Sequence, residues 1–217
     1  MKSTDYLIPI LLGALLFVLS GCLTIKETYT FKKNGSGSMT YALEFDQVDP
    51  ALGERNQEFL PANWSFDSLA AALQTIPGIS RVEVTGGRGD RYLGLGFRFQ
   101  TVSSLNVALS KILLTDSSEV HPFFSYDGDC WVRNHRSDRM AFSEGFLTRS
   151  KDEREVAALL SRLKYEVSMS FKKSVGLVYS GTPVHLTGRK NNEVRMSASL
   201  ADISASPETL SATILLD

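Results

Sequence analysis

The chain has 217 residues, of which 43% are hydrophobic, and its 23 Lys and Arg almost balance its 24 Asp and Glu, for a net charge of −1. That balance argues against nucleic-acid binders that work by neutralising phosphates, so we expect no nucleic-acid partner. The length allows one domain with a sizeable core, and the two cysteines are Cys22 and Cys130.

An apolar run at residues 7–19 lies near the start of the chain and ends in Leu19-Ser20-Gly21-Cys22. A positive charge at Lys2, an apolar core and small residues before a cysteine are typical of an export signal with a peptidase site. The run is shorter than the roughly 20 residues that cross a bilayer as a helix. A membrane-spanning anchor and an ordinary cleaved signal are the alternatives.

The four residues Leu19-Ser20-Gly21-Cys22 resemble the lipobox of bacterial lipoproteins. The resemblance implies cleavage of a signal peptide over 1–21 and acylation of Cys22, which would hold the chain in a membrane of the cell envelope. Three acyl chains would make release negligible, since each buried methylene contributes about 0.8 kcal/mol. Leu23 stands where an aspartate would retain a lipoprotein in the inner membrane of enteric bacteria, so the resemblance favours the outer membrane.

Period-two alternation begins directly after Cys22 and predicts an antiparallel hairpin over about 24–32 and 37–45. Asn34-Gly35-Ser36-Gly37 suits a turn with φ above zero. A lipid cysteine, an alternating strand and a Gly-Ser-Gly turn also resemble the opening of a group of uncharacterised Bacteroidota-type lipoproteins. That resemblance covers only this opening and implies no catalytic residues. Because no linker separates Cys22 from the first strand, we expect the domain to lie close to the bilayer.

The middle of the chain alternates between helix and strand patterns. The expected order is a loop at 46–64, a helix capped by Ser65, strands near 79–85 and 93–99, and a helix capped by Ser103. In the second of these strands Gly94 and Gly96 lie opposite an apolar side. This pattern indicates a close approach of another backbone, or a bend.

The remaining elements are mostly strands. They are a hairpin at 122–126 and 130–135, a helix opened by a capping box at Ser150, and strands near 164–171, 175–179, 193–199 and 210–216. Short turns join most neighbouring strands, so antiparallel pairing should dominate. The predicted fold class is α+β: an antiparallel β-sheet with about three helices packed on one face. The polar stretch 136–150 offers a subdomain break, but we expect a single domain over 22–217.

Five residues in and beside the second hairpin are of the types that ligate zinc, and the hairpin could bring some of them together: His121, Asp127, Asp129, Cys130 and His135. Their spacing matches no zinc motif, and alternation turns the neighbours Asp129 and Cys130 to opposite faces. We therefore predict polar turn residues beside a buried, free Cys130, with no metal or other cofactor.

No catalytic residue is predicted, because the chain has no Gly-x-Ser-x-Gly elbow and His185 lacks an identifiable partner. The sequence favours a membrane-anchored, non-enzymatic binding or assembly module of the bacterial envelope, attached through Cys22. Its partner would be an envelope protein or a lipid-like ligand. An envelope hydrolase or metal-dependent enzyme using residues 121–135 is one alternative. A carrier of an apolar ligand between the sheet and the helices is another.

Overall fold

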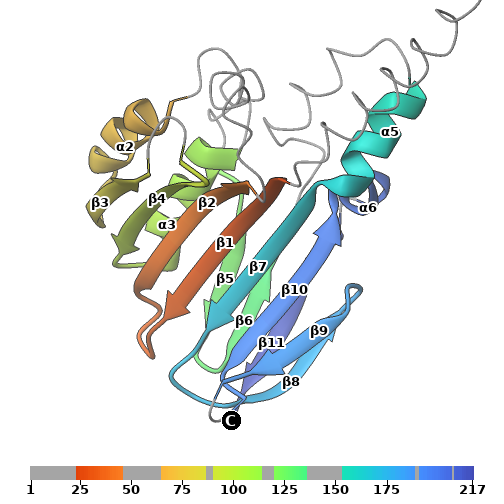
Figure 1. Ribbon diagram of the computed structural model, residues 1–217. Helices are drawn as coiled ribbons and strands as arrows, with labels where there is room; N and C mark the ends of the chain where they lie inside the picture. Colours follow the sequence, from red (N-terminus) through yellow and green to blue (C-terminus); the bar gives the residue numbers. More distant parts are fainter. Residues whose placement is uncertain are drawn as a thin grey trace, which may run out of the picture.

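Two β-sheets and four helices make up the described part of the computed structural model, which covers residues 23–45, 65–86, 90–113, 120–135, 153–188, 191–206 and 208–217 (Figure 1). The elements are β1 (Leu23–Phe31), β2 (Gly37–Phe45), α2 (Phe66–Gln74), β3 (Ile79–Thr85), β4 (Tyr92–Phe99), α3 (Val102–Leu113), β5 (Phe124–Asp127), β6 (Cys130–Arg133), α5 (Glu153–Arg162), β7 (Lys164–Ser170), β8 (Val175–Ser180), β9 (Val184–Thr187), β10 (Glu193–Ser199), α6 (Leu200–Ala205) and β11 (Ala212–Leu216). The predicted signal peptide 1–21, Cys22, the loop 46–64 and the stretch 136–150 with Ser150 lie outside the described residues.

The larger sheet has seven strands in the order β3-β4-β2-β1-β7-β10-β9. At its centre β1 and β2 form an antiparallel hairpin in which Leu23 pairs with Phe45 and Phe31 with Gly37. In the turn the side-chain oxygen of Asn34 accepts a hydrogen bond from the backbone N–H of Ser36 (3.2 Å). The predicted hairpin is confirmed, with its first strand starting one residue earlier than expected.

One strand pair of the large sheet is parallel. β1 and β7 run side by side in the same direction, from Thr24 opposite Lys164 to Thr30 opposite Ser170. The other pairs within the described sheets are antiparallel. Parallel neighbours need a long crossover, and this one contains every element from β2 to α5. Antiparallel pairing therefore dominates as predicted, with one exception at the centre of the sheet.

The smaller sheet has the strand order β5-β6-β11-β8 and lies behind the large sheet in Figure 1. Aromatic side chains fill the space between the two sheets. The ring of Phe31 on β1 lies 4.0 Å from that of Trp131 on β6 and 5.4 Å from that of Phe124 on β5, centroid to centroid. The α+β class is confirmed. The division of the strands between two sheets was not predicted, because alternation shows that a face is buried but not what covers it.

The helices cover the parts of the sheets beside the aromatic core. α2 packs against β3, α3 packs against β5, and α5 and α6 pack against each other and against β10. As predicted, Ser65 caps α2. The apolar side of α3 is buried: Leu105, Ala108, Leu109 and Ile112. None of the helices in the described residues is long and apolar enough to cross a membrane.

Two local predictions need correction. Thr101, not Ser103, caps α3: its Oγ1 accepts the backbone N–H of Ser104 at 3.1 Å, because the helix already begins at Val102. Of the two alternatives for Gly94 and Gly96, the close approach of another backbone is not found. A Cβ at Gly94 would lie 2.7 Å from the ring of Tyr92, and at Gly96 it would meet nothing closer than 3.7 Å.

Candidate functional site

The small sheet has one face packed on the aromatic core and one that points away from it. We call the second the outer face, and it is formed by Cys130, Val132, Leu177, Tyr179, Thr213 and Leu215. Leu215 pairs with both Leu177 and Cys130, while Thr213 pairs with both Tyr179 and Val132. Side chains opposite each other in paired strands are direct neighbours, so these six form two adjoining rows.

Large apolar side chains are exposed on the outer face. Leu177 is 44% exposed, Tyr179 61% and Leu215 37%. Val84, Val120 and Leu186 are the other exposed large hydrophobic residues in the described part of the chain. Half of that set therefore gathers on one sheet face, and a contiguous apolar patch of this kind marks an interaction surface more often than single exposed residues do.

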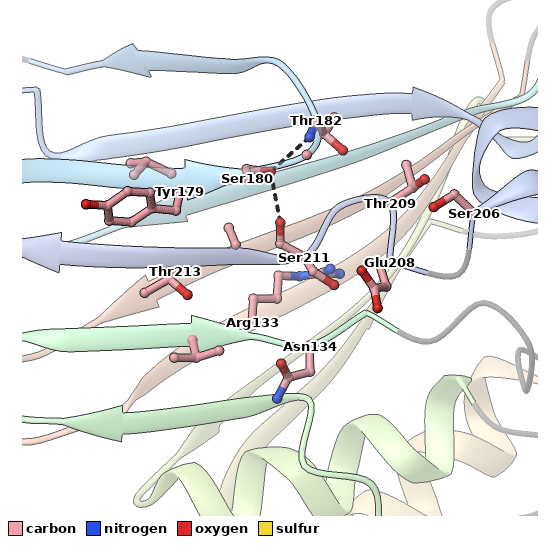
Figure 2. Close-up of a pocket in the computed structure, with 14 residues that line it drawn as sticks. Arg133, Asn134, Tyr179, Ser180, Thr182, Ser206, Glu208, Thr209, Ser211 and Thr213 are labelled. Carbon is pink, nitrogen blue, oxygen red and sulfur yellow. Dashed lines mark hydrogen bonds between the residues drawn. The ribbon is translucent and has the colours of Figure 1, made fainter.

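A groove of about 680 Å³ continues the outer face toward the loop that precedes β11. Figure 2 shows Tyr179 and Thr213 on the strands and Ser206, Glu208 and Thr209 on the loop beside them. The strand side of the groove is partly apolar, through Val132, Val178 and Ala212, and the loop side is polar. The groove can therefore contact apolar groups along the strands and hydrogen-bonding groups along its loop side.

Hydroxyl groups hold the polar side of the groove in place. Ser180 Oγ donates to the carbonyl of Ser211 (2.9 Å) and accepts from the backbone N–H of Thr182 (3.1 Å), as dashed in Figure 2. Thr182 Oγ1 accepts from the backbone N–H of Leu210 (3.0 Å). Leu210 has a φ of 71°, which costs a non-glycine residue on the order of 1–3 kcal/mol. The surrounding contacts therefore fix a strained loop beside the groove.

A buried ion pair lies beneath this loop. The guanidinium of Arg133 donates from Nη1 to the carbonyl of Leu210 (2.8 Å) and from Nη2 to Oε2 of Glu27 (2.6 Å). Tyr29 donates to Oε2 of the same carboxylate at 2.7 Å, and Tyr165 donates to Oε1. The cluster joins β1 and β7 of the large sheet to β6 of the small sheet and to the loop at Leu210.

The charges of Glu27 and Arg133 stabilise each other, although Nε of Arg133 is buried without a hydrogen-bond partner among the described residues. Burial alone would raise the pKa of the Glu27 carboxyl, but the charge of Arg133 and the bonds from Tyr165, Arg133 and Tyr29 outweigh it and leave the pKa below its ordinary value. The side chains of Arg133 and Glu27 are 2% and 0% exposed. With both side chains almost fully buried, the pair holds the two sheets and the groove loop together.

The structure separates the five residues considered for zinc. Asp127, Asp129 and Cys130 lie at the turn of the β5–β6 hairpin, whereas His121 and His135 lie beyond its open end. No group of three metal-ligating side chains occurs among the described residues. Asp129 instead pairs with Lys173. The arrangement gives no support to a metal-dependent enzyme that uses residues 121–135.

The prediction that Cys130 is buried is wrong. It is half-buried on the outer face, because the alternation of β6 directs its neighbour Trp131 and also Arg133 into the core. This placement agrees with the prediction that the side chains of Asp129 and Cys130 point to opposite faces. Cys130 thus belongs to the apolar surface and not to the core.

Two histidines contact serine hydroxyls in the described part of the chain, and both do so through the backbone. The backbone N–H groups of His121 and His135 donate to Ser110 Oγ and Ser211 Oγ, each at 3.0 Å, so these contacts are not imidazole–hydroxyl pairs. The imidazole of His135 is 3% exposed, and burial, then the charge of Arg133, lowers its pKa to about 3. His185 is exposed on β9, opposite Arg195.

Sequence reasoning identified the strands of the outer face but not the face itself. Residues 175–180 read Val-Gly-Leu-Val-Tyr-Ser, with apolar residues in both phases of the alternation. Such a strand indicates apolar surface on both of its sides. That signal was present for Leu177 and Tyr179, but the partner strand that brings Leu215 beside them lies about 35 residues further along the chain.

Comparisons with known proteins assign no family to the chain. No protein-family model and no curated protein matches it. Among solved structures, the chain is similar to the NMR structure of the folded domain of the LppM protein of Mycobacterium tuberculosis, with 13% sequence identity and a TM-score of 0.40 over 90% of each chain.

Proposed function

We propose that the protein is a non-enzymatic binding module of the bacterial envelope, anchored through a lipidated Cys22, that binds an envelope protein with its outer face. One observation carries this: Leu177, Tyr179 and Leu215 are exposed together on an open sheet face. Monomeric soluble proteins rarely leave such side chains grouped without a partner. Leu23 after the cysteine favours the outer membrane as the site of action.

The shape of the surface favours a protein over a small ligand. Small-molecule sites are concave and cover most of the ligand, whereas here Tyr179 is 61% exposed. Protein interfaces combine aromatic and apolar side chains at the centre with a polar rim. The outer face supplies the centre, and Ser206, Glu208 and Thr209 at the groove supply part of a rim.

The space between the two sheets is filled by side chains, which argues against an apolar ligand held there. The ring of Phe31 lies 4.0 Å from that of Trp131 and 5.4 Å from that of Phe171. These side chains fill the space in which a ligand between the described sheets would have to lie.

The proposed anchor at Cys22 directly precedes the folded domain in the sequence, with no linker between them. β1 begins at Leu23, the next residue, and lies between β2 and β7 in the large sheet. A domain held so close to its anchor meets a partner in the same membrane at a high effective concentration. Acylation therefore supports binding without adding any contact to the interface.

The anchor is tested with Cys22→Ser. We expect the variant to leave the membrane fraction and to lack the mass of the acyl chains. An unchanged membrane fraction together with an unchanged mass of the mature protein would refute acylation at Cys22.

The binding surface is tested by cross-linking intact cells, purifying the tagged protein and identifying what accompanies it. Leu177→Lys with Tyr179→Lys should remove the accompanying envelope protein, because two charges would be buried in the interface. Thr28→Lys with Thr30→Lys is the matched control, since both threonines are exposed on β1 of the large sheet. Equal loss in both variants, or no loss in the first, would contradict the proposal.

A further inference from the structure

The tripeptide Phe-Lys-Lys occurs twice in the chain, at Phe31-Lys32-Lys33 and at Phe171-Lys172-Lys173. Each copy stands at the end of one of the two parallel strands, and Thr30 and Ser170, which precede them, are paired. The arrowheads of β1 and β7 accordingly lie side by side in Figure 1. The rings of Phe31 and Phe171 stack with centroids 5.4 Å apart and planes 18° apart. The two copies therefore lie side by side at the same edge of the sheet. We call their four lysines the lysine fork: Lys32, Lys33, Lys172 and Lys173.

The lysine fork lines a pocket of about 250 Å³ with an aromatic floor. Phe31, Trp131 and Phe171 in that floor are each at most 3% exposed. Tyr126 completes the floor, and its ring stacks on Trp131 with centroids 4.4 Å apart. Lysines at strand ends are ordinarily solvated one by one. Here four of them surround a single hollow whose base is apolar.

Hydrogen bonds hold both arms of the fork in place. The hydroxyl of Tyr126 donates to the carbonyl of Lys33 (2.6 Å), and the backbone N–H of Lys32 donates to the carbonyl of Ser36 (2.8 Å). On the other arm, Asn192 Nδ2 donates to the carbonyl of Phe171 (2.8 Å). The backbone at the pocket is therefore fixed before any ligand arrives, which lowers the entropic cost of binding.

Positive side chains outnumber negative ones in the lining of the pocket. Among the described residues that line it, the four lysines are accompanied by one acidic residue, Asp129, which pairs with Lys173. Asp217 lies outside the lining, with its carboxylate beside Gly176. Lysine ammonium groups are compact charges that bind phosphate oxygens. The excess of positive charge over an apolar floor matches a ligand that carries an anionic group and an apolar body.

We infer that this pocket binds a phosphate-bearing ligand, with the phosphate held by the lysine fork and the rest of the ligand against the aromatic floor. The site lies at the far end of β1 from Cys22, and nine extended residues span about 30 Å. It is also separate from the outer face. The inference therefore does not depend on the proposed function, and the two can fail independently.

The test uses the full chain, purified in detergent, with Trp64→Phe so that Trp131 is the single tryptophan. Trp131 fluorescence is followed while inorganic tripolyphosphate, or in a second arm short-chain phosphatidylglycerol, is added. We expect a saturable change in emission in at least one arm. Saturation by tripolyphosphate alone supports a soluble phosphate ligand, and saturation by the lipid alone supports a headgroup.

Three variants make the test specific to the fork. Lys32→Gln with Lys172→Gln should weaken binding about tenfold or more, because two of the four charges are lost. Lys164→Gln, an exposed lysine at the opposite end of β7, should leave binding unchanged. Asp129→Asn should strengthen binding about two- to threefold, because it releases Lys173. The inference is overturned if neither probe saturates below about 10 mM, or if Lys164→Gln weakens binding as much as the fork variant.

Discussion

Replacing Arg133 by methionine should reduce the free energy of unfolding by about 3–5 kcal/mol, because it leaves the buried Glu27 carboxylate without its charged partner. Arg133 makes a charge-assisted bond to Glu27 at 2.6 Å and a second bond to the carbonyl of Leu210 at 2.8 Å. The first contributes about 1.5–3 kcal/mol and the second about 1 kcal/mol. Among the described residues, the hydroxyls of Tyr29 and Tyr165 would still donate to the carboxylate.

The same variant should show a characteristic pH dependence. Without Arg133, burial becomes the dominant influence on Glu27 and raises its pKa above the ordinary value. A carboxyl whose pKa is raised by folding contributes full stability below its unfolded pKa and loses it as the pH rises through the folded pKa. The difference in the free energy of unfolding between Arg133→Met and the parent protein should therefore shrink by about 1 kcal/mol or more as the pH falls from 7 to 5.

Urea unfolding of residues 23–217, followed by circular dichroism, measures both effects. The double variant Glu27→Gln with Arg133→Met is the control, since it carries no buried charge at this position. The double variant should be more stable than Arg133→Met at pH 7. Its loss in free energy of unfolding relative to the parent should not shrink between pH 7 and pH 5. A single variant that loses less than about 1 kcal/mol, or that is no less stable than the double variant, would refute the account of the buried pair.

Two further predictions concern the stability of the same domain. The pKa of His135 is lowered to about 3, so the folded state disfavours the proton that the unfolded chain binds below pH 6.5. Stability should fall by about 2 kcal/mol from pH 7 to pH 5, and His135→Phe should remove most of that fall in urea titrations; an unchanged pH profile would show that another group is responsible. A Cβ at Gly37 would lie 2.1 Å from the carbonyl oxygen of Thr30 and 2.6 Å from the Phe99 ring, whereas at Gly96 it would meet nothing closer than 3.7 Å. Gly37→Ala should therefore lower stability by about 1–3 kcal/mol, and Gly96→Ala should stay within about 0.5 kcal/mol; similar thermal midpoints for the two variants would contradict the packing at Gly37.

Local patterns were enough to predict the elements whose partners are adjacent in sequence. The β1–β2 hairpin follows from strict alternation and from Asn34-Gly35 in the turn, and its predicted bounds agree with the structure to within one residue. The parallel pairing of β1 with β7 could not be read in this way. Its partners are about 140 residues apart, and a parallel crossover leaves no local turn signal. The small sheet depends on other long-range pairings, those of β11 with β6 and β8.

The candidate surfaces were harder to predict than the elements. The five zinc-type residues share one hairpin in the sequence, yet a hairpin places its turn and its open end at opposite ends in space, so Asp127 and His135 are kept apart. The outer face and the lysine fork each combine residues from strands that are distant in sequence. In both cases the chemistry lies in the pairing of strands and not in a contiguous motif.

The central claim, that the outer face binds an envelope protein, is tested most directly by photo-cross-linking in intact cells. A photo-activatable residue at Tyr179 should form an adduct with one envelope protein, because this side chain belongs to the outer face and is 61% exposed. The same residue at Thr28, exposed on β1 of the large sheet, should not form that adduct. No adduct from Tyr179, or the same adduct in equal yield from Thr28, would contradict the account.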